Sequence, residues 1–302
     1  MSTQLDGLWL PRWRSETEAH IHYVKEIVYS GKSDYQRIDI VELEKYGKCL
    51  MLDGVHQSVE ADEFIYHEAV VHPALFLHDL PKNVLIIGGG EGCVLREVLK
   101  HPSVENAVMV DIDELVVQKC KQYLGWEQGA YDDPRTKLII GDGAKFIKQT
   151  DMMFDVVIVD GTTAKPGSIA FDLYGNDFFR DVYTKLNSGG ILAGLGTNAN
   201  ILYLNSHKAI RQTLQSLFGD AYSYSAYCPF YAISYAFVLG VKEHSLDILD
   251  IAKIKPRIKL IQDKLKFYDD ITHLHIFNHP KYMREILNSK EPNINQDKLE
   301  LY

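Results

Sequence analysis

The sequence predicts an α/β protein with a doubly wound, Rossmann-like sheet behind a small antiparallel β domain. Strand-like and helix-like segments alternate from Lys82 onward, which is typical of βαβ units. NVLIIGG at 83–89 is almost entirely apolar and runs into glycines, as a strand buried on both faces should. Residues 20–62 instead carry β-branched and aromatic residues with partial alternation, which predicts short paired strands.

The elements follow in order along the chain. The front part has four expected strands, at 20–29, 35–44, 48–54 and 56–62, with a turn at Tyr46-Gly47. A helix is expected over 64–78. After the strand at 83–89, helices and strands are expected at 92–101, 107–113, 114–124, 136–142, 143–149, 154–160, 178–186, 190–196, 205–218 and 235–241, and the tail at 245–302 reads as helical. We therefore expect a β domain over 1–80 and a catalytic domain with a helical tail over 81–302.

Composition restricts the class of protein. The 302 residues are 46% hydrophobic and 24% charged, which is ordinary for a globular chain. A formal charge of −9 disfavours nucleic acid as a partner, because that binding depends on Lys and Arg. No apolar run approaches the ~18 residues of a membrane span, and no signal-peptide pattern is present, so a cytoplasmic location is expected. The four cysteines have no metal-ligand spacing, and no metal is expected.

A glycine-rich turn is the first sign of a ligand. GGGEG at 88–92, with Gly88, Gly90 and Gly92, lies between a buried strand and a helix, where backbone can approach a ligand and free N–H groups are available. Alone, such a turn can be a tight βα connection without a ligand.

Carboxylates at the ends of successive strands strengthen this interpretation. Asp111 and Asp113 lie about twenty residues beyond the glycines, where an acid can accept both ribose hydroxyls of a nucleoside. Asp142-Gly143 ends the third strand and Asp160 the fourth. Each acid taken singly is most often a helix cap, but together they lie where open α/β sheets bind ligands.

Two cofactor classes fit this pattern: a nicotinamide dinucleotide and an adenosyl-sulfonium compound. The dinucleotide fingerprint is G-x-G-x-x-G, and here the last glycine is out of step because Cys93 follows Gly92. The Asp142-Gly143 pair also has no role in that fingerprint. The sulfonium donor is therefore favoured.

The chain resembles the polyamine aminopropyltransferases, which are the spermidine, spermine and thermospermine synthases. The resemblance runs from about Trp13 to about Val241. It rests on YQRI, LDGVHQ, DEFIYHE, HPAL, IGGGEG, REVLKHPSV, DIDELV and GDGAKF. It implies decarboxylated S-adenosylmethionine as co-substrate, no permanently bound cofactor, and a homodimer or homotetramer built through the front β unit.

The resemblance also implies a role for individual residues. Gln36 would contact the nucleoside, Asp111 the ribose and Asp142 the adenine of the donor, and Glu91 would hold its aminopropyl ammonium. The acceptor channel would be lined by Gln57, Tyr66, His67 and Tyr231. Asp160 would be the acid at the reacting centre, where a carboxylate can orient the attacking amine and take its proton.

One segment departs from the family's pattern. The fourth strand is usually followed by D-x-x-D-P, whereas this chain has DGTTAKPG at 160–167, so Thr163 replaces the second acid and Ala164 the proline. Lys165 adds a positive charge where a polyamine should bind. Asp172 would compensate if the loop folded back. The sequence leaves open which amine is the acceptor.

Two rival functions remain open. An amine methyltransferase using S-adenosylmethionine would share this sheet, but Ile86 stands where such enzymes usually carry an acid. Glu91 would also face the methionine carboxylate, at a cost of about 4 kcal/mol for charges ~4 Å apart. A non-enzymatic protein that binds polyamine or nucleoside is favoured by Thr163 and Lys165.

Overall fold

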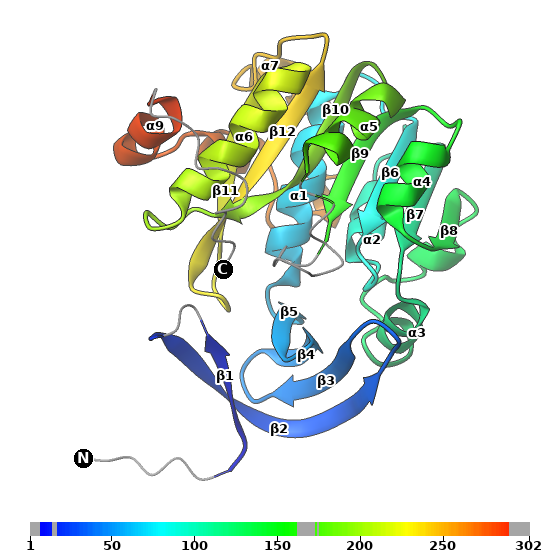
Figure 1. The fold of residues 1–302 in the computed structure, drawn as a ribbon, viewed down its shortest axis with the longest axis vertical. Coiled ribbons are helices and arrows are strands. Elements are labelled where there is room, and N and C mark those ends of the chain that lie inside the picture. The colour runs from blue at the N-terminus through cyan, green and yellow to red at the C-terminus, as the bar shows by residue number, and fades with distance from the viewer. Residues whose placement is uncertain (1–6, 14–16, 162–172, 174, 290–302) are drawn as a thin grey trace.

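The computed structural model describes residues 7–13, 17–161, 173 and 175–289. Within these residues the chain forms a five-stranded sheet, here called the front sheet, and a seven-stranded sheet, here called the large sheet. The front sheet lies at one end of the molecule and the helices surround the large sheet (Figure 1).

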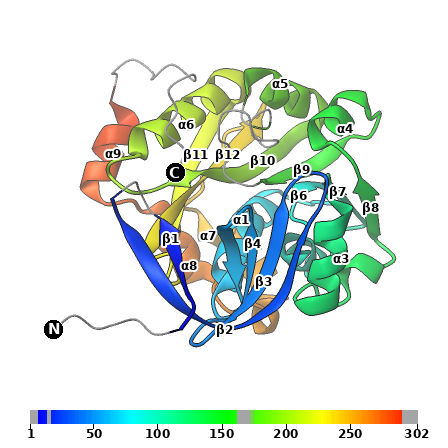
Figure 2. The same cartoon turned by 60° about the horizontal axis from the view of Figure 1, so that its bottom comes forward.

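The front sheet is an antiparallel meander in chain order. Its strands are β1 (Trp9–Trp13), β2 (Ala19–Lys32), β3 (Arg37–Leu43), β4 (Gly47–Leu52) and β5 (Val55–Val59). The predicted antiparallel unit is confirmed, and its turn has Gly47 at φ +70°, which suits glycine. Strand β1 was not predicted. Seen from below, the front sheet curves across the base of the molecule (Figure 2).

The large sheet is Rossmann-like, as predicted. Its order is β11-β12-β10-β9-β6-β7-β8, with β6 to β10 parallel and β12 antiparallel to both neighbours. The strands are β6 (Asn83–Gly88), β7 (Asn106–Asp111), β8 (Thr136–Ile140), β9 (Phe154–Asp160), β10 (Leu186–Asn198), β11 (Gly219–Cys228) and β12 (Ile233–Lys242). Strand β11 was not predicted. Because the carboxyl ends of parallel strands share one edge, Gly88, Asp111 and Asp160 end their strands at the same edge.

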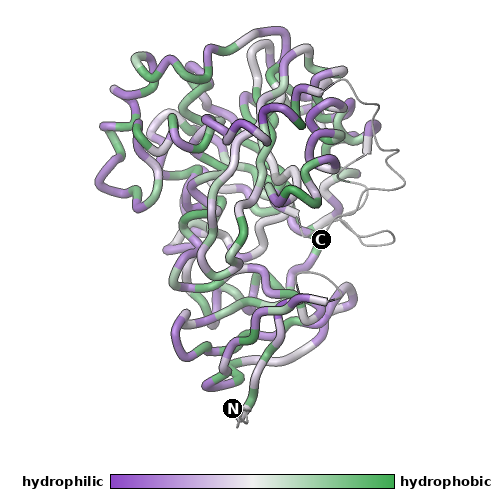
Figure 3. The backbone as a smooth tube through the Cα atoms, turned by 90° about the vertical axis from the view of Figure 1, so that its left-hand side faces the viewer, coloured by the Kyte–Doolittle hydropathy of each residue, from purple (hydrophilic) through white to green (hydrophobic). Residues whose placement is uncertain are grey.

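Helices cover both faces of the large sheet. They are α1 (Glu63–Leu77), α2 (Cys93–Leu99), α3 (Glu114–Tyr123), α4 (Gly143–Gln149), α5 (Asn176–Lys185), α6 (Leu204–Phe218), α7 (Ile251–Lys259), α8 (Asp270–Phe277) and α9 (Lys281–Asn288), with 3-10 turns at Ala130–Asp132 and Gln262–Lys264. Along β6, Val84 and Ile86 pack with α1, α2, α7 and α8, whereas Leu85 and Ile87 pack with α4, α5 and α6. Burial of both faces explains why this strand is apolar without alternation. Hydrophobic segments accordingly run through the interior of the larger domain (Figure 3).

Helix α1 joins the two sheets. It is buried along nearly its whole length, from Glu63 to Leu77, and packs against the large sheet as well as α2. The division at residue 80 stays a prediction. In the part of the chain that the structure describes, no helix has the length and apolar character needed to cross a bilayer.

Candidate active site

The glycine turn brings the ends of β6 and β9 into direct contact. Gly88 has φ +85°, and a Cβ there would lie 2.2 Å from the carbonyl oxygen of Asp160. The N–H of Gly89 donates to that same oxygen at 3.0 Å. A side chain at residue 88 would therefore separate the two strand ends, which is why glycine is required.

Asp111 lies directly behind this turn. A Cβ on Gly90 would be 2.9 Å from its Oδ2, and its Oδ1 accepts from the N–H of Asp113 at 2.9 Å. Burial, together with the charges of Asp113 and Asp160, raises the pKa of Asp111 to about 6. A carboxylate held this close to the turn can accept hydroxyl groups, and its predicted contact with ribose stays a prediction.

Asp113 and Gln36 connect the front sheet to the large domain. Asp113 caps α3 by accepting from the N–H groups of Leu115 and Val116. Its other oxygen accepts from the side chains of Ser33, at 2.6 Å, and Gln36, at 3.0 Å. One of the two side-chain N–H groups of Gln36 therefore donates to Asp113, which fixes the orientation of the Gln36 amide.

Asp142 caps α4 and so has the local role that a strand-end aspartate most often has. It accepts from the N–H groups of Ala144 and Lys145 at 3.0 and 3.1 Å. A Cβ on Gly143 would lie 2.3 Å from Ile87, so glycine lets the start of α4 approach β6. The roles of Asp142 and Gly143 toward the donor stay predictions.

Asp160 accepts a hydrogen bond from Tyr66. The phenol of Tyr66, from α1, donates to Oδ1 of Asp160 at 3.0 Å. Burial and the nearby charge of Glu91 outweigh the effects of His67 and Tyr66, and they raise the pKa of Asp160 to about 6. A carboxylate with a pKa near neutrality at a strand end is suited to proton transfer.

His67 and Glu91 form a buried ion pair. Nε2 of His67 lies 2.5 Å from Oε1 of Glu91, and its Nδ1 lies 2.8 Å from Oε2 of Glu63. The hydroxyl of Ser58 donates to the second oxygen of Glu91. The sequence analysis did not identify Ser58 or Glu63. Glu63 could have been found, because it lies four residues before His67 on the same helix and so faces the same side.

These residues offer no free metal site among the residues described. The side-chain ligand atoms of Glu63, His67 and Cys93 lie within 4.8 Å of one another. However, Arg96 donates to Glu63 at 2.9 Å, and both ring nitrogens of His67 face carboxylates. A cation therefore already occupies the place where a metal would bind.

Aromatic side chains extend from Asp160 toward the front sheet. The ring of Tyr66 meets that of Tyr235 at 5.6 Å, and Tyr235 meets Tyr231 at 5.3 Å. The phenol of Tyr231 donates to the carbonyl oxygen of Gln57. Arg12, which was not predicted, lies over the ring of Tyr231 at 4.3 Å. Such rings attract cations, so this wall suits a positively charged ligand.

The tip of the β11–β12 hairpin carries Tyr231 and is held by the front sheet. The ring of Phe230 stacks on His22 at 4.5 Å and also contacts Tyr46 and His56. The N–H of Phe230 donates to Asp62, at the start of α1, at 2.7 Å. The hairpin tip is thus fixed to the front sheet and to the start of α1.

Comparison with known families decides the identity. A family model described as the spermine/spermidine synthase domain matches residues 63–249, and one described as the spermidine synthase tetramerisation domain matches residues 8–60. The chain belongs to the spermine/spermidine synthase family.

Relatives of this family align over most of the chain. A polyamine aminopropyltransferase of Sulfurisphaera tokodaii is 40% identical over 281 residues, covering 92% of this chain and 93% of the relative. The polyamine aminopropyltransferase of Aeropyrum pernix is 39% identical over 291 residues, covering 95% of this chain and 92% of the relative.

Solved structures give the same assignment. A spermidine synthase in complex with the transition state analogue AdoDATO superposes with a TM-score of 0.86 at 30% identity, over 94% of this chain and 96% of that one. The spermidine synthase of Thermotoga maritima superposes with a TM-score of 0.85 at 30% identity, over 94% of this chain and 95% of that one. The predicted family and fold are confirmed.

The positions that depart from the family's pattern lie outside the described residues, which stop at residue 161 before this gap. Thr163, Ala164, Lys165 and Asp172 all fall there. The proposed consequences of the substitution at Thr163 stay predictions.

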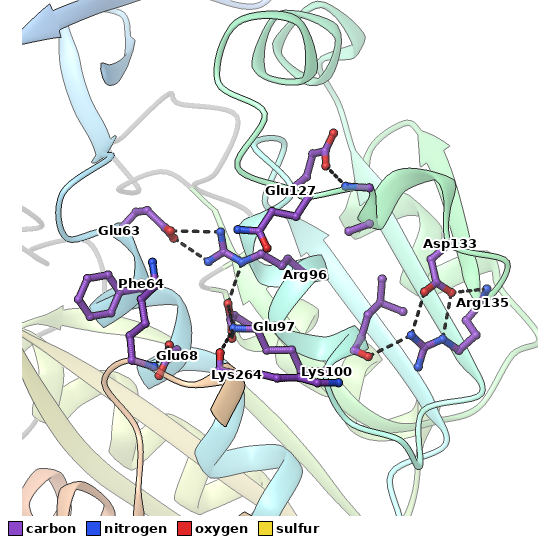
Figure 4. A pocket seen from close by; sticks show the side chains of 15 residues that line it. Glu63, Phe64, Glu68, Arg96, Glu97, Lys100, Glu127, Asp133, Arg135 and Lys264 are labelled. Carbon is purple, nitrogen blue, oxygen red and sulfur yellow. Dashed lines mark hydrogen bonds and ion pairs between the residues drawn. The ribbon is translucent and has the colours of Figure 1, made fainter. Parts of the chain in front are cut away.

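A cavity of about 420 Å³ is lined by residues of the first turns of α1, of α2 and of the segment 127–135 (Figure 4). Glu63, Arg96, Glu97 and Lys100 contribute to its wall, and the figure shows their ion pairs. None of Asp111, Asp142 or Asp160 lines it. This cavity is therefore not the place where the strand-end carboxylates meet.

Proposed function

We propose that this aminopropyltransferase moves the aminopropyl group of decarboxylated S-adenosylmethionine to a di- or polyamine and releases methylthioadenosine. Family membership gives the reaction class and the co-substrate. One observation in the structure supports the assigned roles above all others. It is the hydrogen bond from Tyr66 to Asp160, beside the glycine turn. Nothing in the reaction needs a permanently bound cofactor, because a sulfonium is already a good leaving group.

The central chemical difficulty is the amine. With a pKa near that of lysine, about 10.4, a neutral amine at pH 7 costs about 4–5 kcal/mol. In the proposed step the amine nitrogen bonds to the aminopropyl carbon, and the carbon–sulfur bond breaks with its electron pair going to sulfur. Asp160 takes the proton that the nitrogen loses, and Tyr66 orients Asp160. Glu91 holds the donor's ammonium.

The remaining assignments belong to the same proposal. Asp111 and Asp142 hold the nucleoside together with Gln36, Gly88, Gly90, Gly92 and Gly143. The acceptor lies along Gln57, Tyr66 and Tyr231. The aromatic wall and the acids at the strand ends support a cationic acceptor.

A homodimer or homotetramer is proposed from the match of residues 8–60 to the tetramerisation domain. Exposed apolar side chains on the front sheet, such as Trp13, Ile21 and Ile27, support it. Light scattering that gives the mass of a single chain would refute it. A cytoplasmic location and the absence of nucleic-acid binding stay predictions.

The function is tested by incubating the protein with decarboxylated S-adenosylmethionine and putrescine, cadaverine, agmatine or spermidine in turn. Mass spectrometry should detect an aminopropylated amine and an equal amount of methylthioadenosine. Methylated amine formed from S-adenosylmethionine would instead establish the methyltransferase. Binding of methylthioadenosine without product from any amine would establish the non-enzymatic alternative. Thermal protection by methylthioadenosine but not by S-adenosylhomocysteine would support the first outcome.

The raised pKa of Asp160 predicts an acidic limb in the rate. Below pH 6 Asp160 of the free enzyme becomes protonated and no longer accepts a proton, so kcat/KM should fall about tenfold per pH unit. Above pH 7 the ionisation of Asp160 should cause no further change in kcat/KM. Measuring kcat/KM from pH 5 to 8 checks this limb, and a limb that appears only below pH 4.5 would contradict the assigned environment of Asp160.

A further inference from the structure

His67 lies in the middle of a buried row of alternating charges. Each of its ring nitrogens faces a carboxylate oxygen, Glu91 at 2.5 Å and Glu63 at 2.8 Å, and its side chain is 2% exposed. Carboxylate oxygens only accept hydrogen bonds, so both nitrogens must carry protons. Burial opposes this charge, but the two carboxylates outweigh it and raise the pKa of His67 to about 10.

The row continues behind His67. Arg96 donates to both oxygens of Glu63, at 3.1 and 2.9 Å, and to Glu97 at 2.8 Å. Glu97 is fully buried and also binds Lys100 at 2.6 Å (Figure 4). Glu63 is therefore fixed from behind and cannot turn away from the imidazole ring.

Glu91 is held at the front of the row. His67 contacts one of its oxygens and Ser58 donates to the other. Each oxygen keeps a further lone pair, because a carboxylate offers about four acceptor positions. The side chain is fixed in orientation and can still accept from a ligand ammonium.

The same geometry excludes His67 as a partner for an amine. An imidazolium has no lone pair to accept with, and both of its N–H groups already donate to carboxylates. His67 was expected to line the acceptor channel. In the structure neither of its ring nitrogens is free to contact the acceptor.

We propose that His67 is a positioning cation for the donor, which holds the Glu91 carboxylate oriented toward the donor's ammonium, and that Glu63 and Arg96 hold His67 in turn. This inference rests on the proposed function, because it takes Glu91 as the group that binds the donor. Without the charge of His67, the buried carboxylates of Glu91 and Glu63 would lose the cation between them, and the repulsion between Glu91 and Asp160 would be less compensated.

Binding of two probes tests the proposal. Decarboxylated S-adenosylhomocysteine carries the aminopropyl ammonium, whereas methylthioadenosine lacks it. His67→Gln should weaken binding of the first about 10- to 100-fold, as expected for a disturbed bond to a charged group, and change binding of the second less than about threefold. The matched control is His207→Gln, at another fully buried histidine, which should leave both affinities unchanged. Equal weakening of both probes, or of neither, by His67→Gln would overturn the proposal.

A pH series on Glu63→Gln gives an independent test if His67→Gln does not fold. The charged and titratable groups around His67 are Glu63 and Tyr66 of α1, Glu91 of the glycine turn, Cys93 and Arg96 of α2, and Asp160 of β9. Removing the charge of Glu63 should lower the pKa of His67, so the ring loses its proton as pH rises through that lower value. Affinity for decarboxylated S-adenosylhomocysteine should then fall between pH 6.5 and 8.5, where the wild type stays constant.

The double variant, Glu63→Gln with His67→Gln, should bind this probe weakly at every pH in that range. A pH dependence that survives in the double variant would show that another group titrates and would overturn the proposal. Failure of the proposed function is distinguishable, because it would appear in the wild type as no aminopropylated product from any amine, whereas the comparison of the two probes measures binding alone.

Discussion

Changing Asp160 to asparagine is expected to lower kcat about 10²- to 10⁴-fold while donor affinity stays nearly unchanged. Asparagine has the same shape and can still accept from Tyr66, but it cannot take a proton from the attacking amine. Steady-state kinetics with saturating acceptor give kcat, and calorimetric titration with methylthioadenosine gives the affinity.

Stability separates this catalytic effect from unfolding. The folded pKa of Asp160, about 6, lies above its unfolded value of about 3.8, so stability falls as pH rises from about 4 to 6 and the full cost of ionising Asp160 is present above pH 6. Asp160→Asn should therefore raise the free energy of unfolding by about 1–3 kcal/mol at pH 7.5. The matched control is Asp155→Asn on the same strand, where the carboxylate accepts from backbone N–H groups of Lys82 and Asn83. It should lower stability and keep kcat. An Asp160→Asn enzyme with wild-type kcat would show that another group is the base.

Arg96→Ala is expected to have the largest effect on stability, about 3–5 kcal/mol less free energy of unfolding. The guanidinium pairs with Glu63 and Glu97 and also donates to the carbonyl oxygen of Trp126 at 2.7 Å. Removing it leaves two buried carboxylates without their main counter-charge. Denaturant unfolding of the intact protein measures the change.

A surface pair provides the control for Arg96. Lys121 and Asp132 lie 2.8 Å apart, at nearly the same distance as Arg96 and Glu63, but both side chains are exposed. Lys121→Ala should therefore change stability far less than Arg96→Ala. If both variants lost the same stability, burial would not be the reason why Arg96 matters.

Much of the large sheet could be predicted because its strands are buried on both faces. The runs at 83–89 and 154–160 are apolar and end in glycine or aspartate, so their type and their shared edge follow from local sequence. Strand β11 gives no such signal. Its sequence, GDAYSYSAYC, mixes small and polar residues, and it forms a strand through its pairing with β12 at the edge of the sheet.

The candidate active site could likewise be predicted only where local sequence gives a signal. Aspartates at strand ends can be found by spacing, and Asp113 and Asp142 prove also to cap helices, which is the most common use of such residues. The partners of Glu91 could not be found in this way. Ser58 lies 33 residues away, on strand β5 of the front sheet, and no periodic pattern links positions that meet only through tertiary packing.

The hairpin tip that carries Tyr231 has a mechanical consequence. Phe230 is anchored among rings of the front sheet, while Asp111 and Asp160 end strands of one continuous sheet and Asp142 follows a third strand of it. The wall assigned to the acceptor is therefore only as stiff as the joint between two sheets, whereas the residues assigned to the nucleoside, apart from Gln36, belong to one hydrogen-bonded sheet and its turns. A motion that parts the two sheets should therefore loosen the contacts proposed for the amine before most of those proposed for the adenosine.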